Sequence, residues 1–237
     1  MKSTTRTATP RVRAVTRAPA RAQKPPAKAP RVPLSRERIV TAALQLIDSI
    51  GLEQFTTRTL GKQLGCEAMA IYNHVSSKDE LLDAVADRLM SKVEAPLTGD
   101  WIERARGLAL SYRSLARIHP NAFPLLATRR TSMPSSFKFY DTVFKAAMDE
   151  GLDAFSVARN FRALANFCTG TGLYEINNTA FFASRGMDPA VLGELAAAYP
   201  SLTAATMYFT PAYFDSLFDF GLEALLTAFR KDAARRP

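Results

Sequence analysis

The stretch LGCEAMAIYNHVSSKDELL, Leu64–Leu82, decides how the N-terminal part of this chain folds. Gly65 stands where a helix should end, because glycine readily adopts the left-handed conformation that closes a helix. Small apolar residues resume directly after it, and only Ile71 and Val75 are spaced to anchor the new segment on a core. We therefore expect a short third helix that begins at residue 67 or 68, ends at Val75 and follows a tight glycine turn.

Two further helices precede this turn. In the first, apolar residues recur at helical spacing, and Ser35 is placed to cap its start and Gly51 to end it. The apolar positions are Ile39, Ala43, Leu46, Ile47 and Ile50. A second, shorter helix, capped by Thr56 or Thr57, runs to the glycine turn.

A fourth helix follows the short one. Ser77 can cap it, and Glu80 three residues later completes the pattern of a capping box. Two short helices joined by a tight glycine turn are typical of a helix-turn-helix. The sequence thus predicts an all-α chain whose N-terminal three-helix helix-turn-helix domain covers residues 34–82.

The exposed face of the short third helix suits a DNA major groove. Small residues at its start let its backbone approach closely, and alanine and methionine side chains can contact thymine methyl groups. We expect this face to consist of Ala68, Met69, Ala70 and Tyr72. Tyr72 and His74 can reach phosphates, and Lys78 can hold the DNA backbone from the next helix. Ordinary half-buried packing of Tyr72 and His74 is the alternative.

Positive charge is concentrated at the N-terminus. Residues 1–33 contain nine Lys or Arg and no acid, and since the whole chain carries +9, residues 34–237 sum to zero. Rich in Ala, Pro, Thr and Arg, this tail cannot bury a core, so we expect it to be disordered. It either solubilises the chain or adds phosphate contacts on nucleic acid. A transit peptide is a third interpretation, which the many prolines oppose.

Residues 100–237 are predicted to form helices separated by prolines. We expect them over residues 101–118, 137–149, 156–175 and 213–231. The last two carry long apolar stripes, and the small residues Ala165, Gly172 and Gly221 suit close packing between subunits. Dimerisation also has a physical reason, since one short helix reads too few base pairs and two half-sites multiply the discrimination.

Aromatic residues are abundant in the same part of the chain. Residues 101–237 hold one Trp, fourteen Phe and six Tyr. Such a set builds either a large aromatic core or a pocket for a flat or apolar small molecule. The candidate ligand-binding residues are Trp101, Tyr112, Phe123, Arg129, Phe137, Phe144, Asn166, Phe167 and Glu175. We therefore assign residues 83–237 to a helical ligand-binding and dimerisation domain.

The composition disfavours several classes of function. The chain has two His and two Cys, and it shows no phosphate loop, nucleophile elbow or zinc-ligand spacing. We therefore expect no enzyme, no cofactor and no metal. No apolar run approaches about 18 residues and the N-terminus lacks an apolar signal core, so we expect neither a membrane span nor secretion. The cytoplasm is the expected location, because two cysteines make no disulfide framework.

The segment TTRTLGKQLGCEAMAIYNHVSSKDELLDAV, Thr56–Val85, resembles the DNA-binding domain of the TetR family of bacterial regulators. RIVTAALQLIDSIGLEQF, Arg38–Phe55, matches that family's first helix. FDFGLEALLTAF, Phe218–Phe229, looks like the last helix of its tetracycline-repressor branch. The resemblance implies a homodimer with a four-helix interface that binds a double-stranded DNA operator and a small-molecule effector.

The resemblance also implies roles for single residues. DNA contacts are implied at Thr57, Arg58, Ala68, Met69, Ala70, Tyr72, His74 and Lys78. Arg58 and the first residues of the third helix would reach bases, whereas Tyr72, His74 and Lys78 would hold the backbone. Tetracycline repressors place polar or proline residues where Ala68, Met69 and Ala70 stand, so we expect a different operator.

A metal is not carried over from the resemblance. The tetracycline branch holds its drug as a magnesium complex through a histidine, and Leu125 occupies the nearest position here. His119 lies further upstream beside a proline, where a structural role at a helix end is expected. Tetracycline itself is therefore not the expected ligand.

Together these observations favour a ligand-responsive DNA-binding transcriptional regulator. Its simplest form is a homodimeric repressor that a small hydrophobic or aromatic molecule releases from a palindromic operator. Activation of transcription remains an alternative to repression, because the effect of binding depends on where the operator lies. Two other classes stay open too: a sequence-nonspecific DNA-binding protein without ligand response, and a helical small-molecule-binding protein or enzyme.

Overall fold

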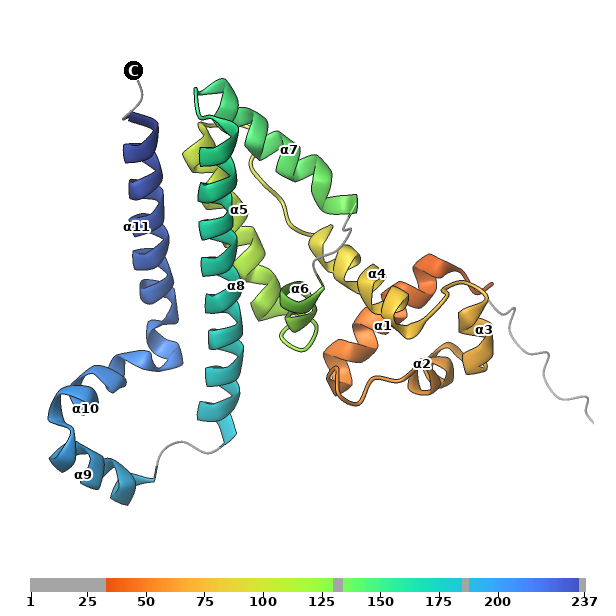
Figure 1. Cartoon of the computed structure of the whole chain (residues 1–237). Helices are drawn as coiled ribbons and strands as arrows, with labels where there is room; N and C mark the ends of the chain where they lie inside the picture. The colour runs from red at the N-terminus through yellow and green to blue at the C-terminus, as the bar shows by residue number, and fades with distance from the viewer. Residues whose placement is uncertain (1–32, 130–133, 185–187, 235–237) are drawn as a thin grey trace, which may run out of the picture. The chain divides into compact units, whose positions relative to one another are not determined.

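The computed structural model describes residues 33–129, 134–184 and 188–234, and every regular element in these ranges is a helix (Figure 1). The predicted all-α class is therefore confirmed. The basic tail, except for its last residue, lies outside the described residues. Residues 34–237 form one compact unit.

The N-terminal helices begin and end where local chemistry requires. α1 spans Arg36–Ile50, and the hydroxyl of Ser35 accepts the backbone N–H of Arg38 at its start. α2 spans Thr57–Leu64, and Thr56 caps it in a capping box with Thr59. Gly65 ends α2 in the left-handed conformation, with φ 68° and ψ 32°. The predicted helix starts at Ser35 and Thr56 and the glycine stop are thus confirmed.

The next two helices correct the sequence-based expectations in detail. α3 spans Ala68–Tyr72 and so ends three residues before Val75, although Val75 is still buried. α4 spans Lys78–Met90, and Ser77 caps it as predicted. The second half of the predicted capping box is wrong, because the Glu80 carboxylate accepts hydrogen bonds from the backbone and hydroxyl of Ser76 instead. α4 also crosses the expected domain boundary at residues 82–83.

The C-terminal helices are α5 to α11. α5 spans Trp101–Ile118 as predicted, and α6, Pro124–Thr128, was not predicted. α7 spans Pro134–Asp149 and starts earlier than expected, because a proline is compatible with the first position of a helix. α8 spans Ala154–Ser184 and continues past residue 175, since neither Gly nor Pro interrupts residues 173–184.

The remaining elements lie between α8 and the C-terminus. α9 spans Pro189–Ala198 and α10 spans Pro200–Thr206, and two 3₁₀ turns, Met207–Phe209 and Pro211–Tyr213, follow. α11 spans Phe214–Ala234. α5, α8 and α11 pack against one another (Figure 1), whereas α4 contacts α1, α6 and α7. α4 therefore joins the helix-turn-helix to the C-terminal helices.

Two glycines allow the C-terminal helices to pack closely within the chain. A Cβ at Gly172 would lie 2.7 Å from the ring of Phe123, and one at Gly221 would lie 2.5 Å from the ring of Phe167. Real Cβ atoms do not approach so closely, so a larger residue at either position would require the neighbouring ring to move. Both glycines therefore serve packing within the chain, and the expected contacts between subunits at Ala165, Gly172 and Gly221 remain a prediction.

Candidate DNA-reading helix and ligand cavity

Two glycines set the turn between α2 and α3. A Cβ at Gly61 would lie 2.8 Å from the backbone oxygen of Cys66, so only glycine lets the turn pass this close to α2. The Cys66 N–H donates to the Gly61 carbonyl over 2.9 Å, and Gly65 supplies the left-handed residue between them. The turn therefore holds α3 at a fixed position against α2.

α3 presents a mostly exposed outer face. Ile71 is completely buried and Val75 is 3% exposed, so these two side chains anchor the segment as predicted. Met69 is 71% exposed, whereas Ala68 and Ala70 are half-buried. Met69 is thus the side chain of α3 that projects furthest from the core.

Three of the candidate DNA-binding residues also brace α3 and the start of α4. The Tyr72 hydroxyl lies 3.4 Å from the Thr57 hydroxyl oxygen. The ammonium of Lys78 donates to the Phe55 carbonyl over 3.1 Å and lies 5.7 Å from the centre of the Phe55 ring. Arg58 is exposed and His74 is half-buried. Contact of these residues with DNA remains a prediction.

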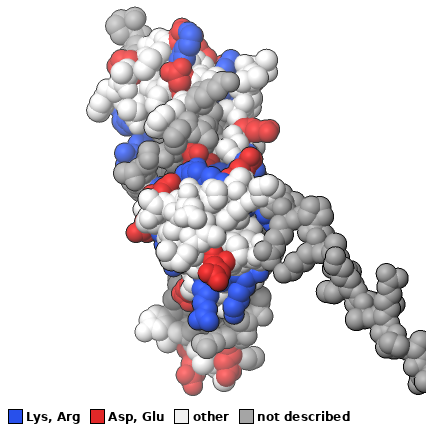
Figure 2. Space-filling view, turned by 90° about the vertical axis from the view of Figure 1, so that its right-hand side faces the viewer, with Lys and Arg blue, Asp and Glu red and all other residues white. Residues whose placement is uncertain are grey.

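The folded helix-turn-helix carries little net charge. Residues 34–82 contain five Lys or Arg and six Asp or Glu, which gives a net charge of −1. Figure 2 shows the side of the molecule that carries α1 to α3, where most of the nearest surface is uncharged and basic side chains gather at its lower edge. Phosphate attraction from this domain must therefore come from local placement of cations rather than from its total charge.

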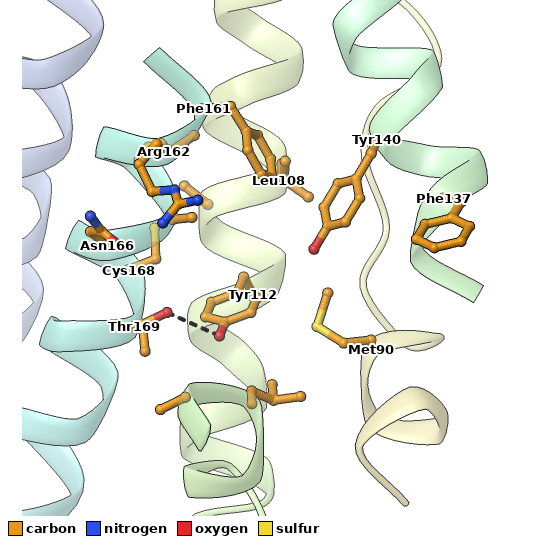
Figure 3. A pocket seen from close by; sticks show the side chains of 15 residues that line it. Met90, Leu108, Tyr112, Phe137, Tyr140, Phe161, Arg162, Asn166, Cys168 and Thr169 are labelled. Carbon is orange, nitrogen blue, oxygen red and sulfur yellow. Dashed lines mark hydrogen bonds between the residues drawn. The ribbon is translucent and has the colours of Figure 1, made fainter. Parts of the chain in front are cut away.

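A cavity of about 360 Å³ lies among α4, α5, α6, α7 and α8 (Figure 3). Three of the nine candidate ligand-binding residues line it: Tyr112, Phe137 and Asn166. The Tyr112 hydroxyl forms a hydrogen bond of 3.1 Å with the hydroxyl of Thr169, another lining residue. The volume lies at the lower end of the range of about 300–1,000 Å³ for small-molecule sites.

Four aromatic candidates lie off this cavity. Phe123 is completely buried beneath Tyr112, with ring centres 5.4 Å apart, and Phe167 packs on Phe218. Trp101 and Phe144 line a separate space of about 20 Å³, too small for a ligand. The surroundings of these four residues match the alternative of an aromatic core, and a role in ligand binding remains a prediction.

The two charged candidates form ion pairs. Arg113 donates to one oxygen of Glu175 from Nε over 3.0 Å and from Nη2 over 2.6 Å, and both side chains are buried. Arg113 also donates to the Phe214 carbonyl, so this pair joins α5, α8 and α11. Arg129 reaches instead to Asp79 and Asp83 of α4.

Sequence reasoning missed most of the cavity wall. Tyr140 of α7, Phe161 and Arg162 of α8, and Met90 of α4 all line it. Periodicity carried a signal for part of the set, because residues 162 and 169 lie four and three positions from Asn166 and so share its side of a helix. No comparable signal links Met90 or Tyr140 to that side, since they come from other helices.

One cysteine lines the cavity without offering a reactive thiol. Burial raises the pKa of Cys168 to about 12. Because the thiolate is the nucleophilic form, this side chain acts as a small apolar wall residue at neutral pH.

His119 ends α5 in the structural role expected for it. Its Nδ1 lies 2.6 Å from the Asp48 carboxylate at the end of α1, and its Nε2 lies 3.0 Å from the ammonium of Lys92. With the ring proton on Nδ1, the imidazole donates to Asp48 and accepts from Lys92. Among the described residues, no group of three His, Cys, Asp or Glu side chains is placed to hold a metal ion.

A helix-turn-helix followed by a helical domain with a cavity among its helices defines the architecture of a one-component regulator. The model of the bacterial regulatory proteins of the tetR family matches residues 39–85, and that of the tetracyclin repressor-like C-terminal domain matches residues 95–231. The second match alone covers more than half of the chain. The chain therefore belongs to the tetR family of ligand-responsive DNA-binding transcription regulators.

Individual relatives agree with this assignment. The chain is 31% identical to the class D tetracycline repressor of Escherichia coli over 66% of this chain and 73% of that protein. It is 29% identical to an HTH-type transcriptional regulator of Saccharopolyspora erythraea over 58% of this chain, and the match spans 59% of that protein. The apo structure of ActR from Streptomyces coelicolor is 26% identical, with a TM-score of 0.72 over 86% of this chain and 98% of ActR. ActR has also been solved in complex with actinorhodin.

Within the described ranges, no helix is both long enough and apolar enough to cross a membrane.

Proposed function

We propose that this chain is a cytoplasmic homodimeric repressor that a small, mostly apolar aromatic molecule releases from a palindromic operator. The observation that carries the proposal is the position of α4. Met90 at its C-terminal end lines the cavity, while Lys78 at its N-terminal end donates to the carbonyl of Phe55, just before α2. A ligand that displaces Met90 therefore acts on the same helix that packs against α1 of the helix-turn-helix.

Exposed apolar side chains on the long helices support the dimer. Tyr174 of α8 is 43% exposed, and Phe220 of α11 is 77% exposed. Side chains of this size are rarely left in water on neighbouring helices unless they meet a partner. A second copy of the chain supplies that partner and places two reading helices on one DNA.

Release from DNA follows from a shift between two forms of the dimer. The ligand must bind the DNA-incompetent form more tightly, because equal affinity for both forms shifts nothing. The names of the relatives support repression of transcription over activation, since the class D protein is a tetracycline repressor. The complex of ActR with actinorhodin supports an aromatic effector.

Selection of bound DNA from a random pool tests the operator. We expect enriched sequences with two-fold symmetry. Enrichment of direct repeats alone, or of no motif, would contradict a homodimeric repressor and would favour a sequence-nonspecific DNA-binding protein.

A panel of aromatic compounds tests the effector. An inducer should release the selected operator and raise the melting temperature of the protein, and it should do both in the presence of a chelator. Asn166→Trp should fill the cavity and abolish the response while DNA binding stays intact. Release that depends on magnesium would contradict the proposal.

A further inference from the structure

Among the residues that the structure describes, the cavity wall has one formal charge. Of the fifteen residues that line it, Arg162 alone carries a full charge, and none is acidic. Most of the others are aliphatic or aromatic. A cavity of this kind favours an apolar ligand with one negative group, because a cationic ligand would be repelled and an anionic group can pair with the guanidinium.

Arg162 differs from three other arginines of the C-terminal part of the chain, whose side chains are held in ion pairs. Arg113, Arg129 and Arg159 are each held by carboxylates: Arg113 by Glu175, Arg129 by the acids of α4, and Arg159 by an acid of α11. Among the described residues, no carboxylate lies within ion-pair distance of Arg162. Its side chain is exposed enough to stay hydrated without ligand, so it can exchange water for an anion when one arrives.

The polar groups of α8 form a single stripe beside the guanidinium. Residues 162, 166 and 169 are spaced by four and three positions, and side chains at this spacing lie above one another on a helix. Figure 3 shows Arg162, Asn166 and Thr169 along the same helix. Arg162 can thus meet a carboxylate with two parallel N–H groups while the Asn166 amide meets another polar atom of the ligand.

The opposite part of the wall suits aromatic rings. Tyr140 of α7 meets Phe161 of α8 edge to face, with ring centres 4.9 Å apart, and Tyr112 and Phe137 also line the cavity. A cavity of about 150 Å³ holds one benzene ring. A volume of about 360 Å³ therefore corresponds to a body of two or three fused rings.

We propose that the effector is an aromatic acid of two or three fused rings, whose carboxylate pairs with Arg162 while its rings lie against Tyr140 and Phe161. The proposal rests on the proposed function, because it takes this cavity as the effector site. It adds the charge of the ligand and the residue that recognises that charge.

Matched acids and amides test it on the full chain. The probes are 2-naphthoate and anthracene-2-carboxylate with the corresponding carboxamides, and calorimetry without DNA measures each Kd. The wild type should bind each acid about ten- to a hundredfold more tightly than its amide, because hydrogen bonds to charged groups contribute about 1.5–3 kcal/mol. Arg162→Gln should remove this preference while leaving amide binding within about twofold, since the rings lose no contact.

Arg159→Gln is the matched control. It removes a cation less than one turn earlier on α8, and that cation pairs with Asp232 instead of lining the cavity. The acid preference should survive in this variant. Circular dichroism and melting temperature should show that both variants are folded, and Arg162→Lys should restore part of the preference because it returns the charge without the fork of N–H groups.

Three outcomes would overturn the proposal: equal or tighter binding of the amides by the wild type, an acid preference that persists in Arg162→Gln, or binding of none of the four probes. The proposed function has a separate readout, which is release of operator DNA. If a neutral compound releases the operator while the acids do not bind, the proposed function as an inducible regulator is supported and the proposal of an anionic effector is rejected. If the acids bind through Arg162 but no compound releases the operator, the anion site is supported and the proposed function as an inducible regulator is rejected.

Discussion

The guanidinium of Arg129 lies 2.8 Å from the carboxylate of Asp83. Arg129 directly follows α6, whose Leu126 and Ala127 line the cavity, and Asp83 lies on α4. A second nitrogen of the same guanidinium pairs with Asp79 over 2.8 Å. The cavity wall and α4 are therefore joined by one side chain as well as by apolar packing.

Arg129→Ala should weaken the coupling between ligand and DNA. We expect the ratio of DNA affinities without and with inducer to fall, because a movement of α6 would no longer be transmitted through this ion pair. Typical coupling between sites corresponds to about a 5- to 150-fold change in affinity, so a loss is measurable. Operator titrations with and without saturating inducer give the ratio.

Ligand affinity and folding supply the controls for Arg129. Both ion pairs are partly exposed, so their loss should change the free energy of unfolding by only about 0–1 kcal/mol. Inducer should bind Arg129→Ala with nearly the wild-type Kd, because the side chain does not line the cavity. An unchanged affinity ratio would show that the apolar contacts of α4 suffice.

Gly61→Ala should disrupt the helix-turn-helix. The added Cβ would meet the Cys66 backbone oxygen at 2.8 Å and the Ala68 nitrogen at 3.3 Å, so the turn must shift. Overpacking of this kind typically costs about 1–3 kcal/mol, and the displaced α3 should also lose affinity for operator DNA. Urea unfolding and operator titration measure the two effects.

Gly170→Ala is the matched control for Gly61. Gly170 lies inside α8, and a Cβ there would meet no atom within 4 Å. Because alanine favours a helix over glycine by about 1 kcal/mol, this variant should be as stable as the wild type or more stable. Equal behaviour of the two variants would contradict the role of Gly61.

The helix-turn-helix could be predicted from sequence because its signals are local. The hydroxyls of Ser35, Thr56 and Ser77 and the left-handed Gly65 act within a few residues of where they stand. Gly61 was missed, because a glycine within a helix gives no sign of what packs on it. The end of α3 was misplaced for a related reason: Val75 is buried, and a buried aliphatic residue at helical spacing need not be helical.

The cavity could be predicted only in part. Tyr112, Phe137 and Asn166 were recognised as aromatic or polar residues on predicted helices, and all three line it. Phe123 has the same sequence character as Phe137, yet one is completely buried and the other is 60% exposed. The difference arises from the packing of five helices, which no local pattern encodes.

Met69→Ala and Tyr72→Ala should affect DNA binding differently. Met69 projects into solvent and meets bases in the proposed complex, so its loss should change preference at one or two base pairs by about 1–3 kcal/mol. Tyr72 braces α3 against Thr57 and holds the DNA backbone, so its loss should weaken binding to all sequences. Gel-shift titrations on operator and point-mutated operators separate the two patterns.

Tyr72→Phe separates the hydroxyl from the ring. It keeps the ring and removes the oxygen that reaches Thr57 and, in the proposed complex, a phosphate. We expect an intermediate loss that is uniform across sequences. If the Met69 and Tyr72 variants all bind like the wild type while circular dichroism is unchanged, α3 is not the reading helix.

The basic tail should set the salt dependence of DNA binding. Residues 34–82 carry a net charge of −1, so most of the long-range attraction to phosphate should come from the nine positive charges of residues 1–33. Each phosphate that a protein neutralises adds about −0.9 to the slope of log affinity against log salt. Deleting residues 1–33 should therefore flatten that slope and lower nonspecific affinity, while the preferred operator sequence stays the same.

A second variant distinguishes the charge of the tail from its length. Replacing all nine Lys and Arg of residues 1–33 by Gln keeps the length and removes the charge. Because counterion release depends on charge, this variant should flatten the slope as much as the deletion does. A wild-type slope in both variants would leave the tail without a part in DNA binding, and a slope that changes only on deletion would assign the effect to something other than charge.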